Sequence, residues 1–78
     1  MFVRLEMTDN GHYKYYSVST NRDERSQNYF TLVEYGRIGT LQSSSHLYDG
    51  PDEEKAILLA REQIRKKIAK GYKIVEER

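Results

Sequence analysis

The hydrophobic pattern of this chain changes its period at Gly50-Pro51, and that change limits the folds open to it. Before this point apolar residues alternate with polar ones in short runs, as in strands with one buried face. After it they recur at spacings of three and four, which is typical of a helix with one apolar stripe. The length of 78 residues suits one small domain. The sequence therefore predicts an α+β fold in a single domain over residues 1–78.

Four segments before the change of period, and one after the helix, have the features of strands. Residues 2–7 alternate, and Asp9-Asn10-Gly11 behind them suits a tight turn. Residues 29–35 carry the strongest strand pattern, and Gly36 and Gly39 are expected to interrupt it with a turn or bulge. Residues 19–28 contain no apolar side chain and are predicted to form a long exposed loop. The predicted strands cover about residues 2–8, 13–19, 29–36, 41–48 and 72–76.

The helix is predicted over about residues 51–70. Pro51 suits the first helical position, and the acidic residues 52–54 complement the positive end of the helix dipole. Gly71 is expected to end the helix in the left-handed conformation. Leu59 falls on the face opposite the apolar stripe. The stripe expected to lie on the sheet consists of Ile57, Ala60, Ile64 and Ile68.

Residue types that support catalysis or metal binding do not occur in a suitable arrangement. The chain has no cysteine, and His12 and His46 lie at no metal-ligand spacing. The acidic cluster at residues 49–54 is explained by its place at the start of the helix. Nucleophile, phosphate-loop and dinucleotide motifs are missing from the sequence. We therefore expect a protein that is not an enzyme, with no metal, no cofactor and no small-molecule substrate.

The same sequence carries no sign of a membrane partner. Its longest apolar run, residues 56–60, is far shorter than the about 18 residues needed to span a bilayer. The first residues do not have the pattern of a signal peptide. The net charge is +1, so no global field points to a polyanion. We expect a cytoplasmic protein.

Basic residues are nevertheless separated from acidic ones along the helix. From Arg61 to Lys73 the lysines and arginines outnumber the single acidic residue, Glu62. Such separation creates a local field that can meet phosphates even when the net charge is near zero. A helix end kept soluble by lysines explains the same pattern, and both interpretations stay open.

Arg37 lies between two glycines, directly after a strand that ends in Tyr35. A guanidinium group can bind phosphate or carboxylate with two parallel hydrogen bonds. The glycines would let a nucleotide approach closely, and a nearby aromatic ring that stacks on a base contributes about 1–3 kcal/mol. A β-bulge whose arginine caps backbone carbonyls accounts for the same residues equally well.

Residues 35–39, which read YGRIG, resemble the signature of the WGR domain, whose name records Trp-Gly-Arg. Residues 2–6 (FVRLE) look like the opening strand of bacterial members. Residues 12–18 (HYKYYSV) are similar to the family strand with the pattern N-K-F-Y-x-I. The segment 52–72 resembles the family helix that starts with acidic residues and ends in K-x-G-Y. The resemblance covers nearly the whole chain apart from the polar loop, and the chain departs from the signature in having Tyr35 for Trp.

This resemblance implies a small antiparallel β-sheet of four to five strands with one α-helix packed on it. In poly(ADP-ribose) polymerases the domain binds DNA at strand breaks, where its Trp packs against the terminal nucleotide. Its Arg helps to pass the signal to neighbouring domains. By resemblance, Tyr35 would be the stacking ring, Arg37 the contact residue and Lys14 a weaker phosphate contact. With the basic helix end added, the predicted nucleic-acid-binding residues are Tyr35, Gly36, Arg37, Gly39, Lys14, Arg65, Lys66 and Lys70.

Two functions follow as hypotheses. The first is a non-catalytic module that binds nucleic acid, with DNA and its strand ends favoured and RNA left open. The second is a module for protein interaction or assembly, such as a homodimer, in which the tyrosines and Leu59 form the contact surface.

Overall fold

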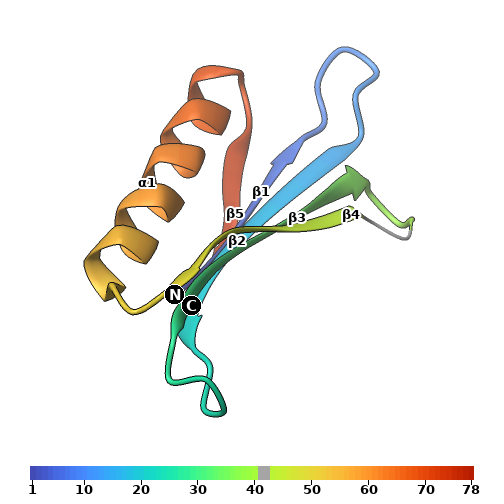
Figure 1. The fold of residues 1–78 in the computed structure, drawn as a ribbon. Helices are drawn as coiled ribbons and strands as arrows, with labels where there is room; N and C mark the ends of the chain where they lie inside the picture. Colours follow the sequence, from blue (N-terminus) through green and yellow to red (C-terminus); the bar gives the residue numbers. More distant parts are fainter. Residues whose placement is uncertain (41–42) are drawn as a thin grey trace.

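The computed structural model, which describes residues 1–40 and 43–78, contains one antiparallel sheet with a helix on one of its faces (Figure 1). The sheet has five strands in the order β4-β3-β2-β1-β5. Because β5 pairs with β1, the segment behind the helix returns to the sheet beside the first strand. The predicted α+β fold, a small antiparallel sheet with one packed helix, is confirmed. The elements are β1 (Phe2–Met7), β2 (Lys14–Arg22), β3 (Tyr29–Arg37), β4 (Ser43–Gly50), α1 (Glu53–Ala69) and β5 (Lys73–Glu77).

The hairpin of β2 and β3 is longer than the sequence predicted at the end that carries its connecting loop. At one end β2 continues to Arg22, which pairs with Tyr29, so the connecting loop is residues 23–28 and the prediction of a loop over residues 19–28 was wrong. Backbone hydrogen bonds hold a strand pair without apolar side chains, and the Arg22 guanidinium lies 5.7 Å from the centroid of the Tyr29 ring. At the other end β3 continues through Gly36, which pairs with Tyr15. Gly36 thus belongs to the strand, within the predicted bounds of residues 29–36, and the turn expected at the two glycines lies at Gly39 alone.

The fourth strand ends later than its prediction. In the described part of the chain it covers Ser43–Gly50, whereas the predicted strand of residues 41–48 ended two residues earlier. Residues 41 and 42 lie outside the part of the chain that the structure describes. The turn before this strand contains Gly39, which has a φ of 86°. Glycine adopts this left-handed conformation without steric cost.

The core lies between the sheet and α1. It consists of alternate residues of the three central strands and one alanine of the helix. Leu5 and Val18 are fully buried, and burying an aliphatic side chain of this size stabilises the fold by about 1.5–3 kcal/mol. The hydroxyl of the fully buried Thr31 donates to the Ala56 carbonyl at 2.7 Å, which ties the start of the helix to β3. The core cluster is Val3, Leu5, Tyr16, Val18, Val33 and Ala60.

Both ends of α1 are capped. The side chain of Asp52 accepts a hydrogen bond from the Lys55 amide at 3.2 Å, so the helix begins at Glu53. Pro51 therefore precedes the cap, and its predicted place as the first helical residue was wrong. At the other end Gly71 has a φ of 107°, as expected, and its amide donates to Ile68. This C-terminal cap turns the chain back toward the sheet.

The helix stripe that faces the sheet differs from the predicted one near the end of α1. Ala56 and Ala60 are buried, but Ile68 is 48% exposed. At about 100° per residue, Ile68 is rotated by about 80° from Ala60, whereas Lys67 is rotated by only about 20°. A lysine therefore occupies the last position of α1 that faces the sheet.

Candidate nucleic-acid interface

Two cross-strand pairs at the adjoining ends of β2 and β3 form the base of the candidate site. Tyr16 lies opposite Tyr35, and Lys14 lies opposite Arg37. Residues two apart on a strand share a face, so both pairs point to the side of the sheet that carries α1. The two tyrosine rings are stacked, with centroids 5.9 Å apart and planes 19° apart.

Lys67 of α1 extends over this base. Its Nζ lies 4.4 Å from the centroid of the Tyr16 ring and 5.5 Å from that of Tyr72. An ammonium group is attracted to the face of an aromatic ring. Burial lowers the pKa of Lys67, and the nearby charges of Lys70 and Lys14 lower it further. The helix and the sheet thus bring several like charges together at this point.

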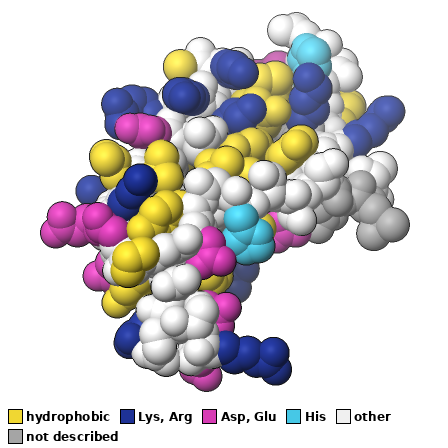
Figure 2. All heavy atoms as spheres, viewed as in Figure 1, with side chains coloured by type: hydrophobic (Ala, Val, Ile, Leu, Met, Phe, Trp, Pro, Cys, Tyr) yellow, Lys and Arg dark blue, Asp and Glu magenta, His cyan; other side chains and the backbone are white. Residues whose placement is uncertain are grey.

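These residues line an open groove of about 460 Å³. The groove lies where the β1–β2 turn, the paired ends of β2 and β3 and the end of α1 meet. Lys and Arg side chains gather in the upper part of the view in Figure 2, whereas acidic side chains at its left lie over the start of α1. Among the residues that the structure describes, none that lines the groove is acidic. The lining residues are Gly11, His12, Tyr13, Lys14, Tyr15, Tyr16, Tyr35, Gly36, Arg37, Lys67 and Tyr72.

The cations of the groove form no ion pair with any other residue that the structure describes. Within residues 1–40 and 43–78, neither Lys14 nor Arg37 forms an ion pair. Like charges directly opposite each other on neighbouring strands are destabilising by about 0.2–1 kcal/mol. An anion bound in the groove would relieve this repulsion.

Aromatic rings are the second component of the groove. Tyr35 is 44% exposed although one of its faces stacks on Tyr16, and Tyr13 is 56% exposed. The Tyr16 hydroxyl donates to Gln63 Oε1 of α1 at 3.2 Å. Exposed rings beside cations are the combination with which proteins bind the bases and phosphates of nucleic-acid strands.

The structure brings together some of the predicted site residues and separates others. Tyr35, Gly36, Arg37 and Lys14 all line the groove, and Lys70 lies near enough to influence Lys67. Gly39 instead borders a smaller hollow on the uncovered face of the sheet. Arg65 and Lys66 are exposed on α1 and are not among the residues that line the groove.

Sequence reasoning missed the inward-facing residues of the site. Tyr16, Gln63, Lys67 and Tyr72 were not among the predicted binding residues. One signal was available, because Lys67 follows Ala60 by seven residues and so shares its helix face. A lysine in line with a buried alanine indicates a side chain whose stem is covered and whose ammonium group emerges at an edge.

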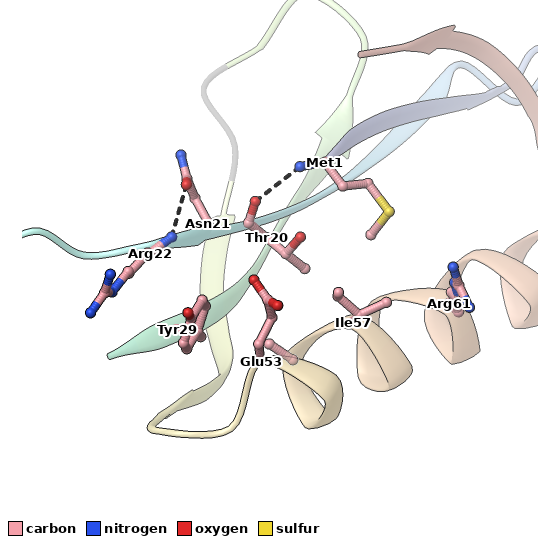
Figure 3. A pocket seen from close by; sticks show the side chains of 9 residues that line it. Met1, Thr20, Asn21, Arg22, Tyr29, Glu53, Ile57 and Arg61 are labelled. Atoms are coloured by element: carbon pink, nitrogen blue, oxygen red, sulfur yellow. Dashed lines mark hydrogen bonds between the residues drawn. The ribbon is translucent and has the colours of Figure 1, made fainter. Parts of the chain in front are cut away.

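A second hollow of about 450 Å³ lies beside the first half of α1 (Figure 3). The Met1 amine donates to the Thr20 carbonyl at 3.1 Å, and the carboxylate of Glu53 points toward the sheet. Arg22 is already hydrogen-bonded to Gln27 at 2.5 Å. Arg61 is the other basic side chain on its lining. With mixed charges and a partnered arginine, this hollow is less suited to a polyanion than the groove.

The fold and the groove together define a small α+β domain with a cationic, aromatic binding surface. The family model of the WGR domain matches residues 1–78, and the chain belongs to the WGR family. This is a binding-type family rather than a catalytic one, and it is often linked to nucleic-acid binding. Comparisons with curated proteins and with solved structures find no significant match.

Clustered metal ligands or a long apolar helix would indicate other kinds of site. No group of three or more His, Cys, Asp and Glu side chains in residues 1–40 and 43–78 is placed to hold a metal ion. In the same ranges, no helix has the length and apolar character required to cross a membrane.

Proposed function

We propose that this domain binds DNA through the groove, with a preference for strand ends or nicks. The observation that carries the proposal is a set of cations beside the exposed ring of Tyr35. Within the described ranges, Lys14, Arg37 and Lys67 form no ion pair. Their mutual repulsion favours an anionic ligand, and the ring favours one that also presents a flat surface. Nucleic acid has both features.

The two components of the groove have different tasks in this proposal. Lys14, Arg37, Lys67 and Lys70 contact phosphates, and the planar guanidinium of Arg37 is suited to two parallel hydrogen bonds. The exposed face of Tyr35 stacks on a base and contributes about 1–3 kcal/mol. A base inside a continuous duplex has both faces covered by its neighbours. The ring therefore favours a terminal base or one at a nick.

The test compares a labelled DNA duplex closed by hairpin loops at both ends with the same molecule carrying one nick. We expect tighter binding to the nicked molecule and a steep loss of affinity with added salt, since each neutralised phosphate releases a counterion. A matched RNA duplex tests the choice of DNA. Absence of binding at low salt would contradict the proposal for any nucleic acid.

Two arginine variants form a matched pair for this titration. Arg37→Ala removes a cation of the groove and is expected to weaken binding. Arg65→Ala removes an exposed cation of α1 that does not line the groove, and is expected to leave binding nearly unchanged. If both variants bind as the wild type does, the groove is not the interface.

Assembly through the sheet edges has less support. Both edge strands contain a register shift, opposite Thr31 and Leu32 for β4 and opposite Arg4 and Leu5 for β5. Such bulges interrupt the ladder and discourage pairing with another chain. Leu59 is partly buried rather than fully exposed. Sedimentation is expected to find a monomer, and a dimer weakened by Tyr35→Ala would favour assembly instead.

A further inference from the structure

We infer that Gln63 is a positioning residue of the interface, which acts on bound DNA through Tyr16 and Tyr35 without contacting it. This inference rests on the proposed function, because the ring that Gln63 orients is the one we assign to base stacking. Gln63 is not among the residues that line the groove, so it acts on the ligand only through the two rings.

A short series of contacts leads from α1 to the groove. Gln63 Oε1 accepts the Tyr16 hydroxyl at 3.2 Å, and the Tyr16 ring stacks on Tyr35 at a centroid distance of 5.9 Å. Tyr16 is 7% exposed, whereas Tyr35 is 44% exposed. The inner ring is thus held by the helix, and the outer ring is supported by the inner one.

The residue type at position 63 supports this assignment. Gln63 is partly buried and lies one helical turn before Lys67, on the side of α1 that faces the sheet. An amide is costly to bury unless it is hydrogen-bonded, so an aliphatic side chain would be the simpler choice for packing. The Gln63 amide accepts the hydrogen bond that fixes the Tyr16 hydroxyl, whereas an aliphatic side chain could only pack on the ring.

The expected consequence is a loss of pre-organisation. A ring already held in its bound orientation loses less conformational entropy when a ligand stacks on it. Without the hydrogen bond, Tyr16 can reorient and Tyr35 loses a fixed support. Lys14 and Arg37 are held by the strand register, so their phosphate contacts are expected to persist.

The experiment uses Gln63→Met, which keeps the length of the side chain and removes the acceptor. The probe is a nicked DNA duplex with 2-aminopurine at the nick, whose fluorescence is quenched when a ring stacks on it. We expect affinity to fall about 3- to 10-fold, as for one lost hydrogen bond. We also expect weaker quenching and an unchanged dependence on salt.

Two tyrosine variants make the result specific. Tyr16→Phe removes the same hydrogen bond from its other end, so the double variant with Gln63→Met is expected to bind no more weakly than either single variant. Tyr29→Phe is the matched control, because Tyr29 lies at the other end of β3, opposite Arg22, and does not line the groove. This variant is expected to quench the 2-aminopurine fluorescence as the wild type does.

A measurement on the free protein separates this inference from the proposed function. The NMR shifts of the Tyr35 ring protons report its stacking on Tyr16, and Gln63→Met is expected to change them without DNA. If they change while the wild type binds no DNA, the ring support is upheld and the proposed function is wrong. If the wild type binds but neither the shifts nor the quenching change in Gln63→Met, the inference is overturned.

Discussion

Replacing Lys14 by glutamine is expected to stabilise the free protein and to weaken its binding to DNA. Lys14 lies directly opposite Arg37 and also adds to the charge that lowers the pKa of Lys67. Removing its charge relieves both repulsions in the unbound state. The same change removes one of the cations that we assign to phosphate contacts.

The structure allows both effects to be estimated. Relief of a like-charge pair at directly opposite positions is worth about 0.2–1 kcal/mol, and for a domain of this size each kcal/mol raises Tm by about 4–8 °C. Tm should therefore rise by about 1–8 °C. If Lys14, Arg37, Lys67 and Lys70 each neutralise one duplex phosphate, the slope of log affinity against log salt is about −3.6, and Lys14→Gln makes it about −2.7. Between about 50 and 200 mM salt, affinity then falls about 40-fold rather than about 150-fold.

Thermal unfolding followed by circular dichroism at low salt measures the first effect, and fluorescence anisotropy at the two salt concentrations measures the second. Arg65→Gln is the matched control, since this arginine is exposed on α1 outside the groove. It is expected to change neither Tm nor the salt slope appreciably. A lower Tm in Lys14→Gln would refute the reasoning about repulsion, and an unchanged salt slope would refute the assignment of Lys14 to a phosphate.

Three further predictions concern stability. Leu5→Ala is expected to lower the free energy of unfolding by about 2–5 kcal/mol in a denaturant titration, whereas Leu58→Ala, at a site 54% exposed, should change it little; similar losses in the two variants would contradict the assigned core. Asp52→Ala should lower the free energy of unfolding by about 0.5–2 kcal/mol, because the N-cap hydrogen bond is lost. A loss of helical circular dichroism confined to heated samples would fit this cause. Burial, with smaller contributions from Tyr35 and Tyr72, raises the pKa of the Tyr16 hydroxyl above its usual 10.0. As the pH rises, this hydroxyl therefore ionises first in the unfolded state, and the free energy of unfolding falls. Tyr16→Phe should therefore lose less stability than the wild type between about pH 8 and pH 11 in parallel denaturant titrations, and an equal loss would refute the argument.

The local elements of the fold were accessible from the sequence because their causes are local. Asn10 and Gly11 adopt positive φ values of 54° and 79°, as expected for the Asp9-Asn10-Gly11 turn. Gly71 ends the helix for the same steric reason. The errors fell at boundaries where non-local pairing decides. Arg22 belongs to a strand only because Tyr29 lies opposite it, and nothing in its immediate neighbours indicates that pairing.

The candidate site was predictable only in part. The short signature placed Tyr35, Gly36 and Arg37 at one point of the chain, since residues adjacent in sequence remain adjacent in space. The basic helix end was recognised as a group, but the prediction named Lys66 from it and left out Lys67. A rotation of about 100° per residue directs one of them to solvent and the other over the Tyr16 ring.

By itself, the sequence determined the change from strands to helix, the turns and caps, and the signature that places the chain in the WGR family. These follow from periodicity, from backbone sterics and from residues that adjoin along the chain. Only the tertiary structure decided that Lys14 faces Arg37 and that Lys67 joins them. The physical reason is register, because a shift of one residue between β2 and β3 would move either side chain to the other face of the sheet. The groove exists because this register and the packing of α1 place the same charges and rings on one side.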